Sequence, residues 1–447
     1  MNIAYYSINS YLPNRLATIG LVYVLCLAYN SLDPRYTNFT FYNDWIKIDG
    51  TNIPYIFILI ILIASLLIYV TAKRKYMTGS IWIYVLVYIN IIGLVLFPMV
   101  NDLLLMYILI ELQSYSLYII TGIYRKSYNA TRGAILYFVT GGIASIGLLV
   151  GIYFIYSQVG TCNIIDITNY YILHNTNTEG VYDGMTLVLL ALVFKMGLAP
   201  LHSWSVAVYN YAPTYITAYI SIVAKFAIMS WIYSNAQLIP TGWVLIIFFM
   251  SLFVGAISPL YQSNIKTILA YSGILNMAYV LIPACLGTDS FYIYLVQYLI
   301  THVLIFNSLL ASNEEVSKPQ TTWSPVINVN RWVVSSIILS IIIIVAFLSL
   351  IGIPPLPGFF GKYFVLQDLI ENNLLIESIS IVIFSVIATY YYAYVIRRLY
   401  QNYMNSENTN IDYPKGLSVT ISYWWVIFIT FFTSIGMISE LLIIYNS

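Results

Sequence analysis

The fold of this chain is decided by two stretches, FKMGLAPLHSW at residues 194–204 and LSLIGIPPLPGFFGK at residues 348–362. Each lies within a long apolar run and carries glycine and proline where a continuous helix would be expected. Proline lacks a backbone donor and clashes with the preceding helical turn. We therefore predict that each run is a helix with a break. The residues expected to form the breaks are Gly197 and Pro200 in the first, and Gly352, Pro354, Pro355, Pro357 and Gly358 in the second.

The composition places these helices in a membrane. The 447 residues are 60% hydrophobic and only 8% charged, whereas soluble domains carry about 25% charged residues. No soluble core could absorb this much apolar surface, so the solvent must be lipid. The sequence therefore predicts an all-α, polytopic membrane protein.

Thirteen apolar windows of about 20 residues predict thirteen transmembrane helices. With this count, thirteen of the eighteen lysines and arginines face one side, two face the other, and three lie inside spans. Basic residues gather on the cytoplasmic or matrix side of membrane proteins, so the asymmetry supports the count. The windows are 16–30, 53–72, 79–98, 104–123, 132–157, 183–201, 215–235, 240–260, 265–286, 290–313, 331–371 with its break, 374–401 and 417–444.

The two broken helices have opposite directions in this count. The first runs toward the basic side and the second runs away from it, which is typical of two inverted repeats with a pathway at their interface. The predicted organisation has four parts: N-terminal helices at 1–103, a first half-channel repeat at 104–239, a second half-channel repeat at 240–373, and C-terminal helices at 374–447.

Four ionisable residues lie inside predicted spans: Glu111, Lys195, Lys225 and Lys362. A charge at the bilayer centre costs about 2.5–3.5 kcal/mol on insertion scales, so such residues usually have a function. A buried lysine tends to lose its proton and a buried carboxylate tends to gain one, while a close pair keeps both charges. Mixed signs therefore predict a proton relay. The alternative is that each lysine is a structural pin that hydrogen-bonds the carbonyls of a broken helix.

Four further polar residues are weaker candidates for relaying protons or orienting water. His302, Tyr271 and Asn276 lie within predicted helices, where packing is the alternative role. Lys266 begins a helix at the basic face, and we interpret it foremost as an interfacial anchor.

Cofactor and metal signatures are absent from the sequence. It contains no GxGxxG, no P-loop and no haem motif. Cys26, Cys162 and Cys285 are too widely spaced for a metal site or a disulfide framework, and we interpret them as small buried hydrophobic residues. We expect no metal and no redox centre in this chain.

Three segments resemble the antiporter-like membrane subunits of respiratory complex I. They are residues 194–227 (FKMGLAPLHSWSVAVYNYAPTYITAYISIVAKFA), 260–281 (LYQSNIKTILAYSGILNMAYVL) and 348–366 (LSLIGIPPLPGFFGKYFVL). The VY-x-x-AP-T form at 208–214 is similar to the subunit 2 branch of this family, called subunit N in bacteria. The richness in Tyr, Ile and Asn resembles a fungal mitochondrial version.

The resemblance assigns roles by position. It implies that Glu111 is the family's buried glutamate, Lys195 its partner, Lys225 a connecting lysine and Lys362 the terminal lysine of the second half-channel. It implies proton translocation across the mitochondrial inner membrane, coupled to NADH-to-ubiquinone electron transfer elsewhere. NADH, FMN, iron–sulfur clusters and ubiquinone would then belong to partner subunits. The expected neighbours are subunit 4, the small membrane-arm subunits and lipids such as cardiolipin.

The sequence departs from the family in two places. The family usually has Pro-Asp after the tryptophan of the first break, but Val206 and Ala207 follow Ser205 here, so any role of that aspartate is absent. The family commonly has fourteen helices, and the one missing from our thirteen is the first. Two other functions stay open at this point: a stand-alone cation/proton antiporter and a purely structural membrane scaffold.

The charge asymmetry predicts that the N-terminus lies in the matrix and the C-terminus in the intermembrane space. Protease protection of terminal tags in mitoplasts checks this, since only the C-terminal tag should be digested. Digestion or protection of both tags would mean that the helix count is wrong by one.

Overall fold

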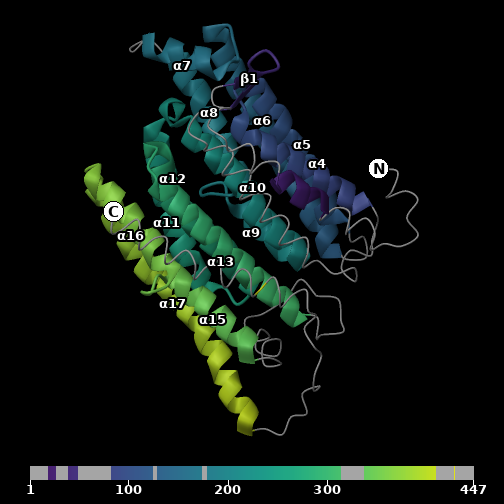
Figure 1. The fold of residues 1–447 in the computed structure, drawn as a ribbon, viewed down its shortest axis with the longest axis vertical. Helices are drawn as coiled ribbons and strands as arrows, with labels where there is room; N and C mark the ends of the chain where they lie inside the picture. Colours follow the sequence, from purple (N-terminus) through teal and green to yellow (C-terminus); the bar gives the residue numbers. More distant parts are fainter. Residues whose placement is uncertain are drawn as a thin grey trace. The chain divides into compact units, whose positions relative to one another are not determined.

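The computed structural model describes residues 19–26, 39–48, 82–123, 128–173, 179–313, 337–408 and 427. These residues are mostly helical, as the all-α prediction requires (Figure 1). The named elements are β1 (Phe39–Phe41), β2 (Ile46–Ile48), α4 (Trp82–Leu96), η2 (Phe97–Met99), α5 (Leu103–Gly122), α6 (Tyr128–Val159), α7 (Ile164–Leu173), α8 (Glu179–Met196), α9 (Ser203–Tyr211), α10 (Thr214–Ser234), η3 (Ala236–Leu238), α11 (Thr241–Ile257), η4 (Ser258–Tyr261), α12 (Ile265–Leu286), α13 (Ser290–Asn313), α15 (Ile337–Ile351), α16 (Pro357–Glu371) and α17 (Leu375–Asn408).

Seven helices in the described part of the chain are long and apolar enough to cross a membrane. They are Leu103–Gly122, Tyr128–Val159, Thr214–Ser234, Thr241–Tyr261, Ile265–Leu286, Ser290–Leu309 and Leu375–Tyr400. The predicted windows at 265–286 and 290–313 match α12 and α13 at both ends. The window at 53–72, both ends of 16–30 and all of 417–444 except Ile427 lie outside the described residues, so the count of thirteen stays a prediction.

A short β-hairpin and a short helix were not predicted. Strands β1 and β2 pair antiparallel, with Phe39 opposite Ile48, and helix α7 precedes α8. Both are much shorter than a membrane span, and α7 carries Asp166 in its first turn. A search for runs of about 20 apolar residues does not detect elements of this length.

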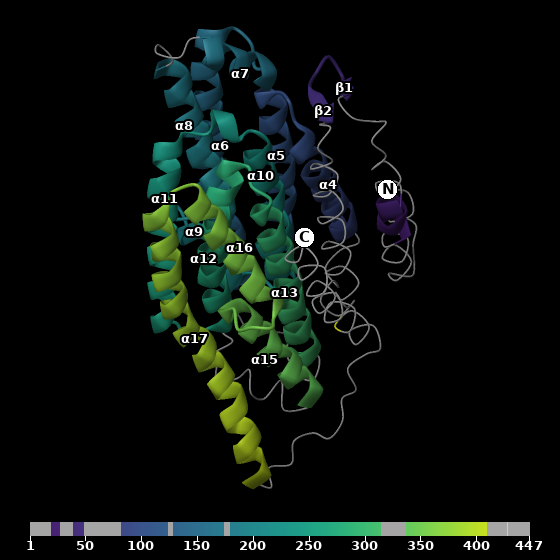
Figure 2. The same ribbon diagram turned by 60° about the vertical axis from the view of Figure 1, so that its left-hand side comes forward.

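The chain divides into two compact units. This division does not test the boundaries predicted for the two repeats, which remain predictions. The first unit contains residues 1–212, 219–247 and 284–287, and the second contains 213–218, 248–283 and 288–447. In the first unit α6 packs on α5, α8 and α9; in the second, α13 packs on α15 and α16, and α17 covers α15 and α16 (Figure 2).

Glycines allow a close contact between α6 and α8 in the first unit. A Cβ placed on Gly151 of α6 would lie 2.8 Å from the carbonyl oxygen of Gly184 in α8, and a Cβ on Gly184 would lie 2.9 Å from the carbonyl oxygen of Gly151. Small residues of this kind let membrane helices pack backbone against backbone. This contact fixes the position of α8, which ends at the first break.

The structure corrects two interpretations of burial. Cys26 is exposed and Cys162 and Cys285 are half-buried, and all three are free thiols, so they are not buried core residues. Burial and the nearby Asp102 raise the pKa of the Cys162 thiol. Lys266 is only 4% exposed, so it is not a surface anchor. The sequence could not reveal this, because it does not show which face of α12 packs inward.

Gly151→Ala should destabilise the protein by about 1–3 kcal/mol, because the new methyl group meets backbone that cannot move aside cheaply. Gly147→Ala is the matched control, one turn earlier in α6, where a Cβ meets nothing within 4 Å. Thermal melting of the purified assembly checks both variants. Equal melting temperatures would contradict the close packing of α6 and α8.

Candidate functional site

The first predicted break is present between α8 and α9. The Gly197 N–H donates to the carbonyl of Phe194 at 2.9 Å and the Leu198 N–H donates to that of Val193 at 3.1 Å. This pair of bonds is a Schellman motif, and Gly197 has the positive φ of 71° that the motif requires. Pro200 follows, so the helix cannot continue.

Lys195 lies in the last turn of α8 and pairs with Glu111 of α5. Its Nζ is 3.6 Å from Glu111 Oε1, and both side chains are at most 10% exposed. Nζ also donates to the Tyr118 hydroxyl at 3.4 Å. Helix α5 is fixed at its start by Asp102, whose Oδ1 accepts from two backbone N–H groups of the first turn. The structure therefore brings together the carboxylate and lysine that the sequence predicted as partners.

Aromatic side chains cover the first break. The Trp204 ring stacks on Phe194 at 5.3 Å and on Tyr137 at 4.6 Å between centroids. Its Nε1 donates to the carbonyl of Phe194 at 2.9 Å. Tyr137 in turn contacts Tyr118 edge to face at 4.6 Å. Because irregular backbone at membrane depth must be covered by protein, this wall explains how the break is tolerated beside Lys195.

The second predicted break is present between α15 and α16, with the same terminal motif. The Gly352 N–H donates to the carbonyls of Ser349 and Leu348 at 3.0 and 3.1 Å, and the Ile353 N–H donates to that of Leu348 at 3.4 Å. Gly352 has a φ of 88°. Both broken helices therefore end their first half in a Schellman motif built on glycine.

Lys362 lies in α16, after the second break, and hydrogen-bonds backbone carbonyls that precede the break. Its Nζ donates to the carbonyls of Leu350 at 3.0 Å and Ile351 at 2.8 Å. These carbonyls belong to the last turn of α15, where no helical donor follows. Lys362 thus makes the hydrogen bonds expected of a structural pin, which was the alternative to a relay. The relay role predicted for this lysine stays a prediction.

Each lysine predicted for the relay lies beside a tyrosine. Lys225 and Lys362 lie over the rings of Tyr209 and Tyr279, with Nζ 5.7 and 5.8 Å from the ring centroids, whereas Lys195 Nζ, 5.9 Å from the centroid of Tyr118, lies at the hydroxyl end of that side chain. A cation within about 6 Å of an aromatic face is stabilised by the ring quadrupole, and the gain rises to about 2 kcal/mol when water is excluded. Sequence reasoning missed these partners, because 44 tyrosines offer no way to select three.

Lys225 is the most deeply buried of the three relay lysines, with 2% exposure in α10. It lies in the first unit with Glu111 and Lys195, whereas Lys362 lies in the second unit.

The weaker candidates occupy varied surroundings. Asn276 is 2% exposed, donates to the Ser272 carbonyl at 2.8 Å and accepts from the Tyr294 hydroxyl at 2.7 Å. His302 is 1% exposed, with its ring 3.9 Å from that of Tyr298. Tyr271 is half-buried. The roles of these residues and of the buried Lys266 stay predictions.

Comparisons with known proteins fix the family. The family described as "NADH:quinone oxidoreductase/Mrp antiporter, TM" matches residues 100–389. This chain belongs to that family. The predicted resemblance to antiporter-like membrane subunits is therefore confirmed.

Individual relatives agree with the family. NADH-ubiquinone oxidoreductase chain 2 of Candida albicans is 50% identical over 94% of this chain and 88% of its own length. The protein of the same name from Debaryomyces hansenii is 41% identical over 96% and 95%. A chain of respiratory complex I from Thermus thermophilus shares the fold, with a TM-score of 0.78, 22% identity and coverage of 97% of this chain and 92% of that chain.

Gly197→Ala should destabilise the first break by at least the cost of left-handed backbone at a non-glycine residue, about 1–2 kcal/mol. A Cβ there would also lie 2.7 Å from Ser205. Gly160→Ala is the control, since Gly160 has a φ of 80° but a Cβ meets nothing within 4 Å. Melting temperatures of both variants check this, and an equal loss would show that packing at the break adds nothing.

Proposed function

We propose that this chain is the chain 2 subunit in the membrane arm of mitochondrial complex I and moves protons along Glu111, Lys195, Lys225 and Lys362. One observation carries the proposal: the ion pair of Glu111 and Lys195 is buried beside a break in a membrane helix. A buried ion pair contributes little to stability, because desolvation offsets the attraction between the charges. Keeping one in a span therefore favours a function in which the charges change.

The pair has the chemistry of a proton switch. At 3.6 Å the charges stabilise one another. If the ammonium moves away, each charge is left in apolar surroundings, and the neutral forms become cheaper. Lys195 then releases a proton to the next acceptor along the chain and becomes an amine, while Glu111 takes one up and becomes a carboxylic acid. When the pair is restored, Glu111 releases its proton and Lys195 takes up a new one from the entry side rather than from the acceptor it supplied, so that one cycle moves a proton forward and leaves the protein unchanged.

The proposed relay continues through Lys225 to Lys362. The burial of Lys225 makes its ammonium costly, which favours a group that passes its proton on. Energy for the cycle would come from electron transfer between NADH and ubiquinone in partner subunits that hold FMN and iron–sulfur clusters. We infer that this chain itself carries neither metal nor redox centre.

The assembly and topology follow from the same proposal. We infer thirteen transmembrane helices with two inverted repeats in the mitochondrial inner membrane, with the N-terminus in the matrix and the C-terminus in the intermembrane space. The neighbours would be subunit 4 and the small membrane-arm subunits, with cardiolipin-type lipids at the rim. A stand-alone cation/proton antiporter is the second candidate, since the family description itself joins the two classes.

Glu111→Gln, Lys195→Ala and Lys362→Ala should each lower proton pumping linked to NADH–quinone turnover by tenfold or more, since positioned proton-transfer groups contribute about 10²–10⁴ in rate. The measurement uses assembled complex in proteoliposomes. Glu371→Gln, an exposed carboxylate at the end of α16, is the control and should pump normally. Wild-type pumping in all three core variants would leave the buried charges as structural pins, and pumping by the isolated chain would favour the antiporter.

A further inference from the structure

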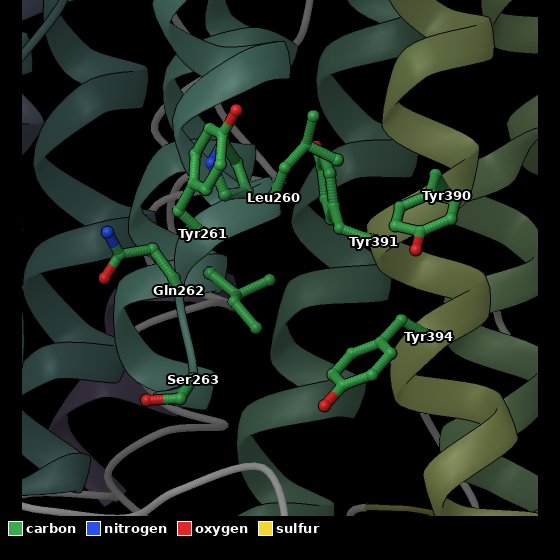
Figure 3. A pocket seen from close by; sticks show the side chains of 9 residues that line it. Leu260, Tyr261, Gln262, Ser263, Tyr390, Tyr391 and Tyr394 are labelled. Carbon is green, nitrogen blue, oxygen red and sulfur yellow. The ribbon is translucent and has the colours of Figure 1, made fainter.

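A pocket lies between η4 and α17, in the second unit, which also contains Lys362 (Figure 3). Its volume is about 290 Å³. Figure 3 shows Tyr390, Tyr391 and Tyr394 reaching toward it from α17, opposite the segment that carries Gln262 and Ser263. Arg398 donates to the Tyr394 hydroxyl at 3.2 Å, so the α17 side of the pocket is polar.

Tyr391 connects this pocket to the interior of the second unit. It lines the pocket, yet its side chain is 2% exposed. Its hydroxyl is buried without a hydrogen bond to any described residue. Its ring lies 4.4 Å from that of Tyr392, measured between centroids. The Tyr392 side chain is its neighbour, and a buried hydroxyl at a pocket whose hydrogen bonding is not completed by protein is a position where ordered water is expected.

The polar groups continue inward from Tyr392. The Asn276 amide donates to the Tyr392 hydroxyl at 3.4 Å, and its oxygen accepts from the Tyr294 hydroxyl at 2.7 Å. Tyr294 contacts Tyr279 edge to face, with centroids 5.9 Å apart. The Tyr279 ring is the one that faces the Lys362 ammonium at 5.8 Å. Four tyrosines and one asparagine therefore lead from the pocket to the second helix break.

Around Lys362 the structure holds more polar atoms than the described residues satisfy. The Tyr279 hydroxyl, Gln297 Oε1 and Ser349 Oγ are buried without hydrogen bonds to described residues. Gln297 lies against α16, because a Cβ on Gly361 would overlap its Oε1 and a Cβ on Gly358 would lie 3.0 Å from its Nε2. Burying a polar atom without a partner is unfavourable, so a cluster of such atoms indicates hydration or function.

We propose that Tyr391, Tyr392, Tyr294 and Tyr279 line a hydrated branch that carries protons from the η4–α17 pocket to Lys362. The proposal rests on the proton relay proposed above and adds to it a separate entrance for the second half. Along the branch each hydroxyl, or a water between two hydroxyls, accepts a proton on its oxygen as it releases its own, so no residue is changed. The last transfer adds a proton to the neutral Lys362 amine and forms the ammonium. Asn276 is a positioning residue that holds the hydroxyls of Tyr392 and Tyr294.

Tyr391→Phe and Tyr294→Phe test the branch, because each keeps the ring and removes only the hydroxyl. In assembled complex, each should lower proton pumping and coupled turnover about tenfold, less than the roughly 10²–10⁴ of a positioned proton-transfer group because water replaces the hydroxyl in part. Since both lie on one path, the double variant should be no slower than the slower single variant. Tyr400→Phe is the matched control, an exposed tyrosine on the same helix α17, and should behave as wild type.

Two further measurements distinguish the possible outcomes: the amount of assembled complex in each variant, and proton pumping by Lys362→Ala. If the phenylalanine variants lower only the amount of complex and each assembled complex pumps normally, the tyrosines are packing residues and the branch is wrong. If the variants pump normally while Lys362→Ala does not, the branch is wrong and the relay stands. If Lys362→Ala also pumps normally, the relay itself fails and takes the branch with it. Slow pumping in both phenylalanine variants with normal assembly supports the branch.

Discussion

Hydrogen bonding of the backbone within lipid is the constraint on which this structure depends. A carbonyl or amide without a partner costs several kcal/mol in hydrocarbon, so a membrane helix can be interrupted only where other groups replace the lost bonds. Here the replacements are built from residues that also serve the proposed chemistry. The Gly197 and Gly352 turns satisfy two carbonyls each, Trp204 adds a second hydrogen bond to one of those at the first break, that of Phe194, and Lys362 satisfies two more at the second.

This constraint explains why two of the buried lysines, Lys195 and Lys362, lie beside the breaks. An ammonium needs acceptors, and a broken helix offers carbonyls that have lost their helical donors. Lys195 has a carboxylate as its main partner, whereas Lys362 has backbone carbonyls. The same type of side chain is therefore held by a titratable group in one unit and by a non-titratable one in the other. The Tyr118 hydroxyl adds a hydrogen bond to Lys195, and the Tyr279 ring adds a cation–π contact to Lys362.

The sequence alone was enough to predict features that depend on the composition of long segments. The spans of α12 and α13, the two breaks and the pairing of Glu111 with Lys195 were predicted, the last through the family resemblance. Features that depend on which side of a helix packs inward were not accessible. The burial of Lys266 and the contacts of Tyr118, Tyr209 and Tyr279 are of this kind. The β1–β2 hairpin and α7 were missed because they are too short for the windows used.

The two carbonyls that hold Lys362 have a consequence for its protonation. An ammonium has three N–H bonds, and two of them are used by the carbonyls of Leu350 and Ile351. A neutral amine keeps two N–H bonds and gains one lone pair. It can therefore donate to the same two carbonyls, with its lone pair at the remaining corner of the tetrahedron. The backbone of the break need not rearrange when this nitrogen gains or loses a proton, and only that one corner of the nitrogen takes part in the exchange.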